Sequence, residues 1–264
     1  MTKSELKELL DEKYIEYCKS EFFIETDPIQ IPKYFEDKED IEISGFLAAS
    51  LAWGQRPTII KKCKELMHLM EFAPYDFLMH AETNDYARFR NFKHRTFNGY
   101  DCIYFLQSLA NIYKKHGGLE QVFTQAYQRH NDMIEALKEW YSIFTELPAE
   151  NRVLRHIANV NKGSAAKRIN MYLRWMVRQD GEVDFGLWHH IPPSALLIPL
   201  DLHTGNTSRQ LGLLNRKQND CKAVIELTTR LREFDPKDPI RYDFALFGLG
   251  AFERQSSTPD FPRF

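Results

Sequence analysis

The stretch ISGFLAASLAWGQRPTIIKKCKELMHLME, residues 43–71, predicts two helices joined by a short turn. Its first part is almost entirely apolar, which indicates a buried helix, and Asp40 just before it is a candidate N-cap. Gly54 to Pro57 end that helix, and Pro57 suits the first position of the next helix, where no backbone N–H is needed. The stretch therefore favours a fold built from packed helices.

Helical periodicity continues in both directions along the chain. Thr2 and Glu5 form a capping-box pattern before a first helix, whose apolar positions include Leu6, Leu10 and Phe22. Further helices are expected at 74–80, 101–115, 119–130, 132–146, 152–159, 165–179, 184–189, 203–213, 217–233 and 239–249. No run shows the strict alternation of a half-buried strand, so we expect an all-α protein with a surface-bound tail over 254–264.

The composition is that of a globular protein without a strong global charge. The chain has 264 residues, of which 43% are hydrophobic and 13% aromatic, and its formal net charge is −2, so any nucleic-acid site must be a local patch. The four cysteines include no C-x-x-C pair, which excludes the usual spacing of zinc and iron–sulfur ligands. With no apolar signal core and no membrane-length apolar run, we expect a soluble, cytoplasmic protein.

Positive charge gathers in one segment. Between Asn151 and Arg178 there are seven Lys or Arg residues and no acid, and Lys167, Arg174 and Arg178 share a narrow arc of the expected helix. Beside a turn led by Gly163, such a stripe could bind phosphates, but a solvated helix face is the commoner case. A second patch, FRNFKHRTF at residues 89–97, interleaves cations with aromatics, which suits nucleic acid or packed aromatics under a loop.

Asp201 is a carboxylate at the end of the apolar run ALLIPL. Aspartate is a favoured N-cap, and LHTGNTSRQLGLL behind it predicts a helix. A carboxylate held rigidly at a helix start and partly desolvated also suits stabilising a developing cation or moving a proton. Both interpretations remain open at this point.

Lys167 is the natural chemical complement of Asp201. It follows Gly163 by one short turn, where apolar neighbours and Arg168 would favour a neutral, nucleophilic amine. An exposed, solvated lysine is the ordinary alternative. Asp201 lies 34 positions after Lys167, so spacing does not bring the two together.

These turns resemble the paired signature of the helix-hairpin-helix DNA glycosylase superfamily. Gly163-Ser-Ala-Ala-Lys167 resembles the G-x-G-x-K hairpin of the endonuclease III branch, and Pro199-Leu-Asp201-Leu-His203 resembles its P-V-D-T-H. Residues 44–66, the middle region from FRNFKHRTF to HGGLE, and DPIRYDFALFGLG resemble archaeal 8-oxoguanine DNA glycosylases. The pattern GSAAKR-x-N-x-Y-L-R-W-M-V-R with IPLD-x-H is also similar to an uncharacterised bacterial family. Ala165 replaces the second hairpin glycine, and an insert stands around DFGLWHHIPPS.

The resemblance implies two helical subdomains with a helix-hairpin-helix-like element and a cleft between them. One subdomain would comprise residues 1–40 and 160–264, with the hairpin and the aspartate, and the other residues 41–159. In the cleft Lys167 would form a Schiff base with the sugar of a flipped damaged nucleoside, an oxidised purine being favoured, while Asp201 stabilises positive charge. The resemblance implies a base-reading role for Gln55 and pocket positions for Trp53, Asp243 and Phe247. Contacts to the DNA backbone would come from Gly163, Ser164, Arg168, Arg174, Arg178 and His203.

The implied enzyme is a monomeric DNA glycosylase with abasic-site lyase activity, acting on double-stranded DNA without a metal or other cofactor. Two alternatives remain. A non-catalytic DNA-binding relative would keep the fold while Lys167 and Asp201 serve only as surface and cap. An all-α metal-dependent phosphohydrolase could use His189, His190 and His203, although no His-Asp dipeptide occurs.

Overall fold

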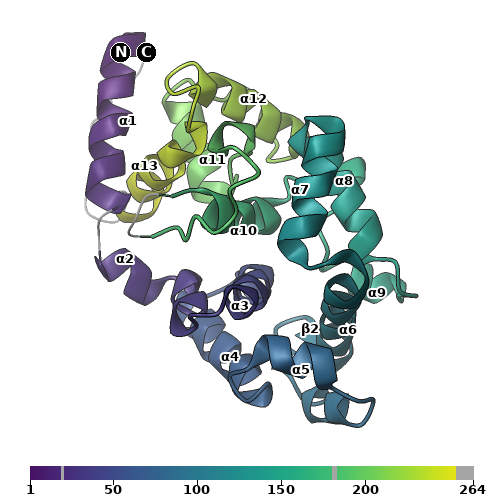
Figure 1. The fold of residues 1–264 in the computed structure, drawn as a ribbon. Helices are drawn as coiled ribbons and strands as arrows, with labels where there is room; N and C mark the ends of the chain where they lie inside the picture. The colour runs from purple at the N-terminus through teal and green to yellow at the C-terminus, as the bar shows by residue number, and fades with distance from the viewer. Residues whose placement is uncertain (19–20, 180–182, 254–264) are drawn as a thin grey trace.

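The structure is a computed structural model that describes residues 1–18, 21–179 and 183–253. In these residues the fold is helical apart from one two-stranded hairpin, which confirms the all-α prediction (Figure 1). The α-helices are α1 (Lys3–Cys18), α2 (Glu21–Thr26), α3 (Lys38–Leu51), α4 (Arg56–Leu69), α5 (Pro74–His80), α6 (Gly99–His116), α7 (Leu119–His130), α8 (Met133–Phe144), α9 (Asn151–Leu154), α10 (Lys167–Val177), α11 (Leu202–Gln210), α12 (Cys221–Arg232) and α13 (Tyr242–Gly248). Short 3₁₀ turns are η1 (Pro28–Gln30), η2 (Pro32–Tyr34), η3 (Asp85–Phe89), η4 (Val160–Lys162), η5 (Pro193–Ala195) and η6 (Pro239–Arg241), and a π-helical turn, η7 (Leu249–Glu253), follows α13.

Several expected helix boundaries are confirmed by local hydrogen bonds. The Thr2 and Glu5 capping box is formed, with the Thr2 N–H donating to Glu5 at 2.7 Å and the Glu5 N–H donating to Thr2 at 3.3 Å. Helices α5 and α7 have the expected bounds. Gly117, at φ 77°, ends α6 in the left-handed conformation that glycine adopts without strain, so the Gly-Gly pair separates α6 from α7.

Other expectations are wrong. The N-cap residue of α3 is Asp37, whereas Asp40 lies inside the first turn and accepts the Tyr75 N–H of α5 at 2.7 Å. Pro57 occupies the second position of α4. Residues 184–189, where a helix was expected, form an irregular segment. The expected helix at 152–159 shortens to α9, and the tail at 254–264 lies outside the described residues.

A small hairpin interrupts the helices. Strand β1 (Lys93–His94) pairs antiparallel with β2 (Phe97–Asn98), so that Lys93 faces Asn98 and His94 faces Phe97. Arg95, in the connecting turn, has a φ of 56°. Asn98 then caps α6 by accepting the Tyr100 and Asp101 N–H groups, so the Asn-Gly pair here starts a helix.

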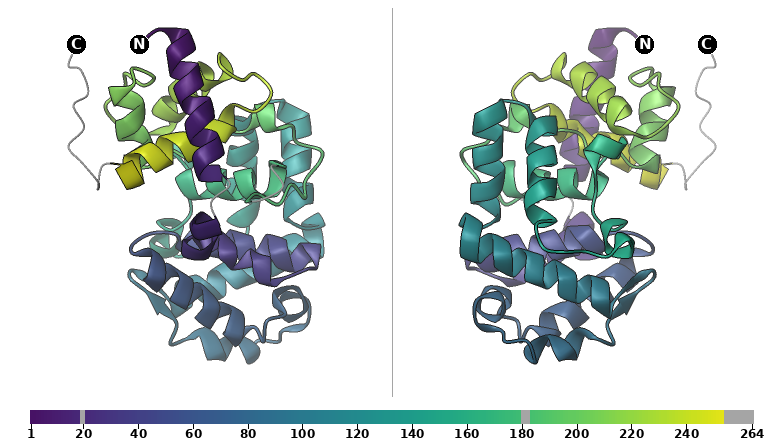
Figure 2. Two further views of the ribbon diagram at one scale, coloured as in Figure 1. Left: turned by 90° about the vertical axis from the view of Figure 1, so that its left-hand side faces the viewer. Right: turned by 90° about the vertical axis from the view of Figure 1, so that its right-hand side faces the viewer.

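The first and last α-helices of the described residues pack together. Helix α1 lies beside α13, as Figures 1 and 2 show from three directions. The rings of Tyr14 and Phe244 lie 6.2 Å apart, and the Tyr242 hydroxyl donates to Asp11 at 3.0 Å. Turns η1 and η2, from residues 28–34, pack on α3 and α4 instead, and α10 packs on α3. The division into two subdomains at residue 40 stays a prediction.

The expected cationic stripe on α10 is wrong for Arg174 and Arg178, which expose 4% and 2% of their surface. Arg174 donates to Asp184 at 3.2 Å and to Asp243 at 2.5 Å. Arg178 donates to Asp184 at 2.5 Å and to Asp238 at 2.9 Å. This buried ion-pair network ties α10 to the segment after it and to α13. Neither arginine is available to a DNA backbone.

The network predicts a large stability cost for Asp184→Asn. Asp184 has a fully buried side chain between two arginines, so neutralising it removes the carboxylate that Arg174 and Arg178 share and leaves excess buried positive charge. We expect the free energy of unfolding in urea to fall by about 3–5 kcal/mol. Glu233→Gln, which weakens exposed ion pairs with Lys3 and Arg230, should change the free energy of unfolding little and is the control. Equal costs for the two variants would contradict the buried network.

Candidate functional site

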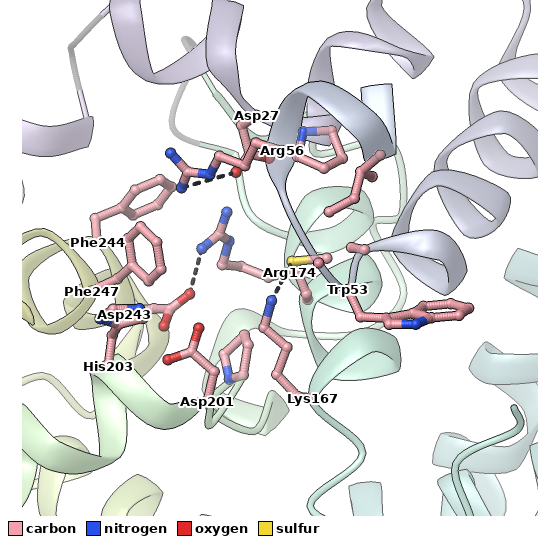
Figure 3. A pocket seen from close by; sticks show the side chains of 16 residues that line it. Asp27, Trp53, Arg56, Lys167, Arg174, Asp201, His203, Asp243, Phe244 and Phe247 are labelled. Carbon is pink, nitrogen blue, oxygen red and sulfur yellow. Dashed lines mark hydrogen bonds and ion pairs between the residues drawn. The ribbon is translucent and has the colours of Figure 1, made fainter. Parts of the chain in front are cut away.

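One pocket gathers residues from distant parts of the chain (Figure 3). Its cavity volume is about 240 Å³, which suits a small ring system more than a large ligand. The wall is built from the start of η1, the α3–α4 region, helix α10, the start of α11 and helix α13. The lining residues are Asp27, Pro28, Ala52, Trp53, Gly54, Arg56, Ile59, Lys167, Met171, Arg174, Pro199, Asp201, His203, Asp243, Phe244 and Phe247.

Lys167 and Asp201 both line this pocket. Their separation in sequence did not show whether they would meet, and the fold brings them to one cavity. Lys167 is the first residue of α10, directly after Ala166 in a left-handed conformation at φ 50°. Its half-buried side chain places Nζ 3.2 Å from the sulfur of Met171, a weak acceptor. Within the described residues Lys167 has no carboxylate at ion-pair distance.

Asp201 both caps a helix and faces the pocket. It is the N-cap of α11, with extended backbone, and its Oδ1 accepts the Thr204 N–H at 2.9 Å. The capping prediction is confirmed. Asp201 also lines the pocket, with Pro199, so its capping role leaves it at the cavity.

The other charged groups of the pocket neutralise one another. Arg174 pairs with Asp243 at 2.5 Å, and an oxygen of Asp27 lies 3.6 Å from the guanidinium of Arg56. Lys167 and Asp201 are therefore the lining pair of opposite charge that forms no ion pair among the described residues. Burial raises the pKa of Asp243; Arg174 and Lys167 oppose the shift, and Asp201 adds to it. Both charges therefore lie close enough to Asp243 to shift its pKa.

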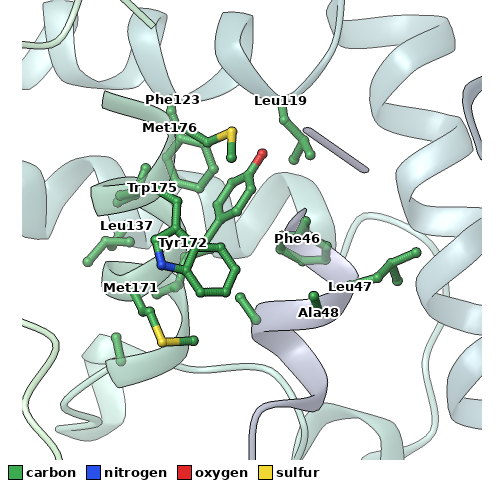
Figure 4. Packing of buried hydrophobic residues seen from close by; sticks show 14 of the residues in the cluster. Phe46, Leu47, Ala48, Leu119, Phe123, Leu137, Met171, Tyr172, Trp175 and Met176 are labelled. Carbon is green, nitrogen blue, oxygen red and sulfur yellow. The ribbon is translucent and has the colours of Figure 1, made fainter. Parts of the chain in front are cut away.

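Helix α10 positions Lys167 because its opposite face is anchored in the core. Lys167, Met171 and Arg174 follow the pocket wall at spacings of four and three residues. On the other face the ring of Tyr172 meets Phe46 of α3 edge-on at 5.6 Å (Figure 4). An added Cβ on Gly45 would lie 3.2 Å from Met176, so the small residue lets the two helices approach closely.

Aromatic side chains form further parts of the wall. Trp53 is half-buried, and the guanidinium of Arg168 lies 4.9 Å from its ring, which fixes the indole from behind. Arg168 itself donates to the Ser50 carbonyl at 2.6 Å, which holds its guanidinium in place beside Trp53. His203 Nδ1 lies 3.1 Å from the Gly250 carbonyl, and its ring meets Phe247 at 5.8 Å. If Nδ1 carries the proton, Nε2 is an acceptor.

The expected site residues divide into two groups. Lys167, Asp201, Trp53, Asp243 and Phe247 meet in the pocket, and so does His203, which was expected at the DNA backbone. Gln55 is exposed and is not among the lining residues, because its neighbour Arg56 turns inward at the start of α4.

The turn at Gly163 does not offer the free amides that were expected. The Gly163 N–H donates to the Val160 carbonyl at 3.0 Å and the Ser164 N–H to the Asn159 carbonyl at 3.2 Å. The Ala166 N–H donates to the Ser164 hydroxyl at 3.1 Å. These amides are satisfied within the turn, so Gly163 and Ser164 serve the geometry that leads into α10.

The wall residues that the sequence patterns missed include Asp27, Arg56, Met171 and Phe244. Asp27 stands before Pro28, and an Asp-Pro pair is typical of a turn. Arg56 is adjacent to the predicted Gln55. Neither position has a periodicity or motif that would single it out, because what brings them to the pocket is the packing of η1 and α4.

The described residues contain no group of three or more His, Cys, Asp or Glu side chains arranged to hold a metal ion. His189 and His190 are exposed and do not line the pocket with His203, so the histidine cluster of the phosphohydrolase alternative does not form. Among the helices that the structure describes, none has the length and apolar character needed to cross a membrane.

Comparison with protein families gives one match. Residues 27–252 match the family described as "Protein of unknown function (DUF2400)". The chain belongs to this family. No curated protein and no solved structure matches it. Membership of DUF2400 agrees with the likeness to an uncharacterised family, while the likeness to DNA glycosylases rests on the residues of this chain alone.

The double role of Asp201 predicts different stability effects for two substitutions. Asp201→Ala removes the acceptor of the Thr204 N–H and should lower the free energy of unfolding by about 1 kcal/mol, whereas Asp201→Asn keeps it and should cost less than about 0.5 kcal/mol. Urea unfolding measures both. Asp37→Ala, at an N-cap without a side-chain hydrogen bond, is the control and should change little. A stability loss in Asp201→Asn as large as in Asp201→Ala would refute the capping account.

Proposed function

We propose that this protein is a DNA base-excision glycosylase with associated abasic-site lyase activity, and that it acts on a damaged base flipped out of double-stranded DNA. The observation that carries the proposal is that Lys167 and Asp201 line one small pocket while its other charged residues pair among themselves. A pocket with aromatic walls, a free amine and a free carboxylate fits a nucleoside whose base is to be released.

In this proposal the amine of Lys167 attacks the C1′ atom of the sugar as the bond from C1′ to the base breaks. The departing base takes the bonding electrons and receives a proton, which balances the one that the attacking amine gives up. Asp201 stabilises the positive charge that builds on the sugar and accepts a proton from the attacking amine. Opening of the sugar ring then gives a Schiff base, whose later elimination cleaves the strand.

The DNA backbone needs exposed cations, and the neighbourhood of the pocket supplies them. An open groove of about 740 Å³ shares Lys167 with the pocket and is lined by exposed Arg155 and Lys162. On another part of the rim, an added Cβ on Gly54 would lie 2.8 Å from exposed Arg95. These cations replace Arg174 and Arg178 as the groups that we expect to meet phosphates.

Borohydride trapping tests the amine. On duplex DNA with an abasic site, wild-type protein should give a covalent adduct that Lys167→Gln reduces to background, because the Schiff base requires this amine. Lys115→Gln, an exposed lysine at the end of α6 that lines neither the pocket nor the groove, is the control and should keep the adduct. Asp201→Asn should slow release of a damaged base by about 10²–10⁴-fold.

Three other outcomes would contradict the proposal or its assignment of the amine. Salt-sensitive binding to damaged duplex without any adduct would favour a non-catalytic DNA-binding protein. An adduct that persists in Lys167→Gln would assign the amine elsewhere. If the protein forms no adduct and does not bind DNA, DNA is not its substrate.

The groove predicts the salt dependence of binding. Arg155→Ala combined with Lys162→Ala should reduce the slope of log affinity against log salt by about 0.9 per lost phosphate contact, hence by nearly 2. Fluorescence anisotropy over a salt series on one labelled duplex measures the slope. Lys114→Ala with Lys115→Ala, exposed at the end of α6, is the charge-matched control. An equal change in both double variants would mean that the groove is not the backbone site.

A further inference from the structure

The proposed reaction needs the amine of Lys167 and the carboxylate of Asp201 at a fixed separation, because both act on one sugar. The two side chains face one cavity (Figure 3), but they come from the starts of different helices, α10 and α11. Among the described residues they form no ion pair with each other. Their separation therefore depends on what joins the two turns that carry them.

A short linking segment, residues 219–221, is bonded to the turn that leads into α10. Ser164 and Asp220 pair as a single antiparallel β-bridge. Beside it, the Cys221 N–H donates to the Gly163 carbonyl at 3.0 Å. Asp220 is also the N-cap residue of α12, so the linking segment is itself fixed at the start of a helix.

The same segment is bonded to the turn that leads into α11. Asn219 donates from Nδ2 to the main-chain carbonyl of Asp201 at 2.9 Å, and its Oδ1 accepts from Arg209 at 2.6 Å. Arg209 in turn donates to the Arg216 carbonyl at 2.8 Å. The amide can lie only this way round, because a guanidinium cannot accept and a carbonyl cannot donate. Asn219 thus ties the backbone of Asp201 to the linking segment.

Gly205 makes the approach of Asn219 possible. An added Cβ at this position of α11 would lie 2.7 Å from Oδ1 and 2.9 Å from Nδ2 of Asn219. Glycine inside a helix is less favourable than alanine, unless another group must come close to the backbone. Here the group that comes close is the amide that holds Asp201.

We propose that Asn219 is a positioning residue for the proposed reaction, and that it sets the distance of the Asp201 carboxylate from the Lys167 amine. The inference rests on the proposed function and adds a residue to it. Asn219 lines the groove with Lys167 but is not among the residues that line the pocket, so it acts on the reaction through Asp201.

Asn219→Ala tests the contact. The probe is a duplex with an abasic site, and the readout is the single-turnover rate constant of adduct formation under borohydride with protein in saturating excess. Loss of the amide should lower this rate constant by at least about 10-fold, because Asp201 is no longer held in place. Gln218→Ala is the matched control, since Gln218 is an adjacent exposed amide that accepts from Arg216 and lines neither the pocket nor the groove. It should leave the rate constant unchanged.

Two combined variants separate positioning from other roles. In an Asp201→Asn background, Asn219→Ala should cause no further loss, because the carboxylate that it positions is absent. Gly205→Ala should displace the amide and slow the reaction as Asn219→Ala does, and the two changes together should be no slower than Asn219→Ala alone. A further loss in the Asp201→Asn background would mean that Asn219 binds DNA directly, and would overturn the inference.

The remaining outcomes also decide. Urea unfolding of every variant accompanies the kinetics, and rate constants that simply follow stability would overturn the inference in favour of a structural role. An Asn219→Ala rate constant equal to wild type would overturn it as well, while the proposed function would stand. Wild-type protein that forms no adduct overturns the proposed function and this inference with it.

Discussion

The structure depends on the burial of two arginines on one helix. Arg174 and Arg178 lie inside the protein, and each needs carboxylate partners because an unpaired buried charge is too costly to keep. Asp184, Asp238 and Asp243 provide them. The ion pairs hold α10 against α13 and the segment after it, while apolar contacts hold its other face on α3. Every wall of the pocket is attached to this helix or to something that packs on it.

The same constraint explains the chemistry available in the pocket. Arg174 occupies Asp243, and Arg56 accompanies Asp27, so these acids and cations cancel locally. Lys167 begins the anchored helix, and Asp201 is fixed by capping α11. The amine and the carboxylate are both held rigidly and form no ion pair with each other among the described residues. Both are therefore available to act on a third molecule.

Local patterns explain which expectations held. The Thr2 capping box and the Gly117-Gly118 break succeeded because capping and left-handed backbone depend on neighbours in sequence. The prediction of Asp40 as an N-cap failed because its carboxylate accepts the N–H of Tyr75, 35 residues further along the chain. The cationic stripe failed because periodicity shows which residues share a face of a helix but not what that face meets. Arg174 in α10 and Arg178 just after it meet acids from other segments.

The sequence by itself determined that the chain is helical, that Asp201 caps a helix and that a lysine starts another, since these follow from short-range hydrogen bonding and apolar spacing. Only the tertiary structure decided that Lys167 and Asp201 share a pocket, that Gln55 stays outside it, and that Asp27 and Arg56 complete its wall. Burial requires apolar faces to be covered and charges to be paired, but local sequence patterns do not identify which distant residues do so.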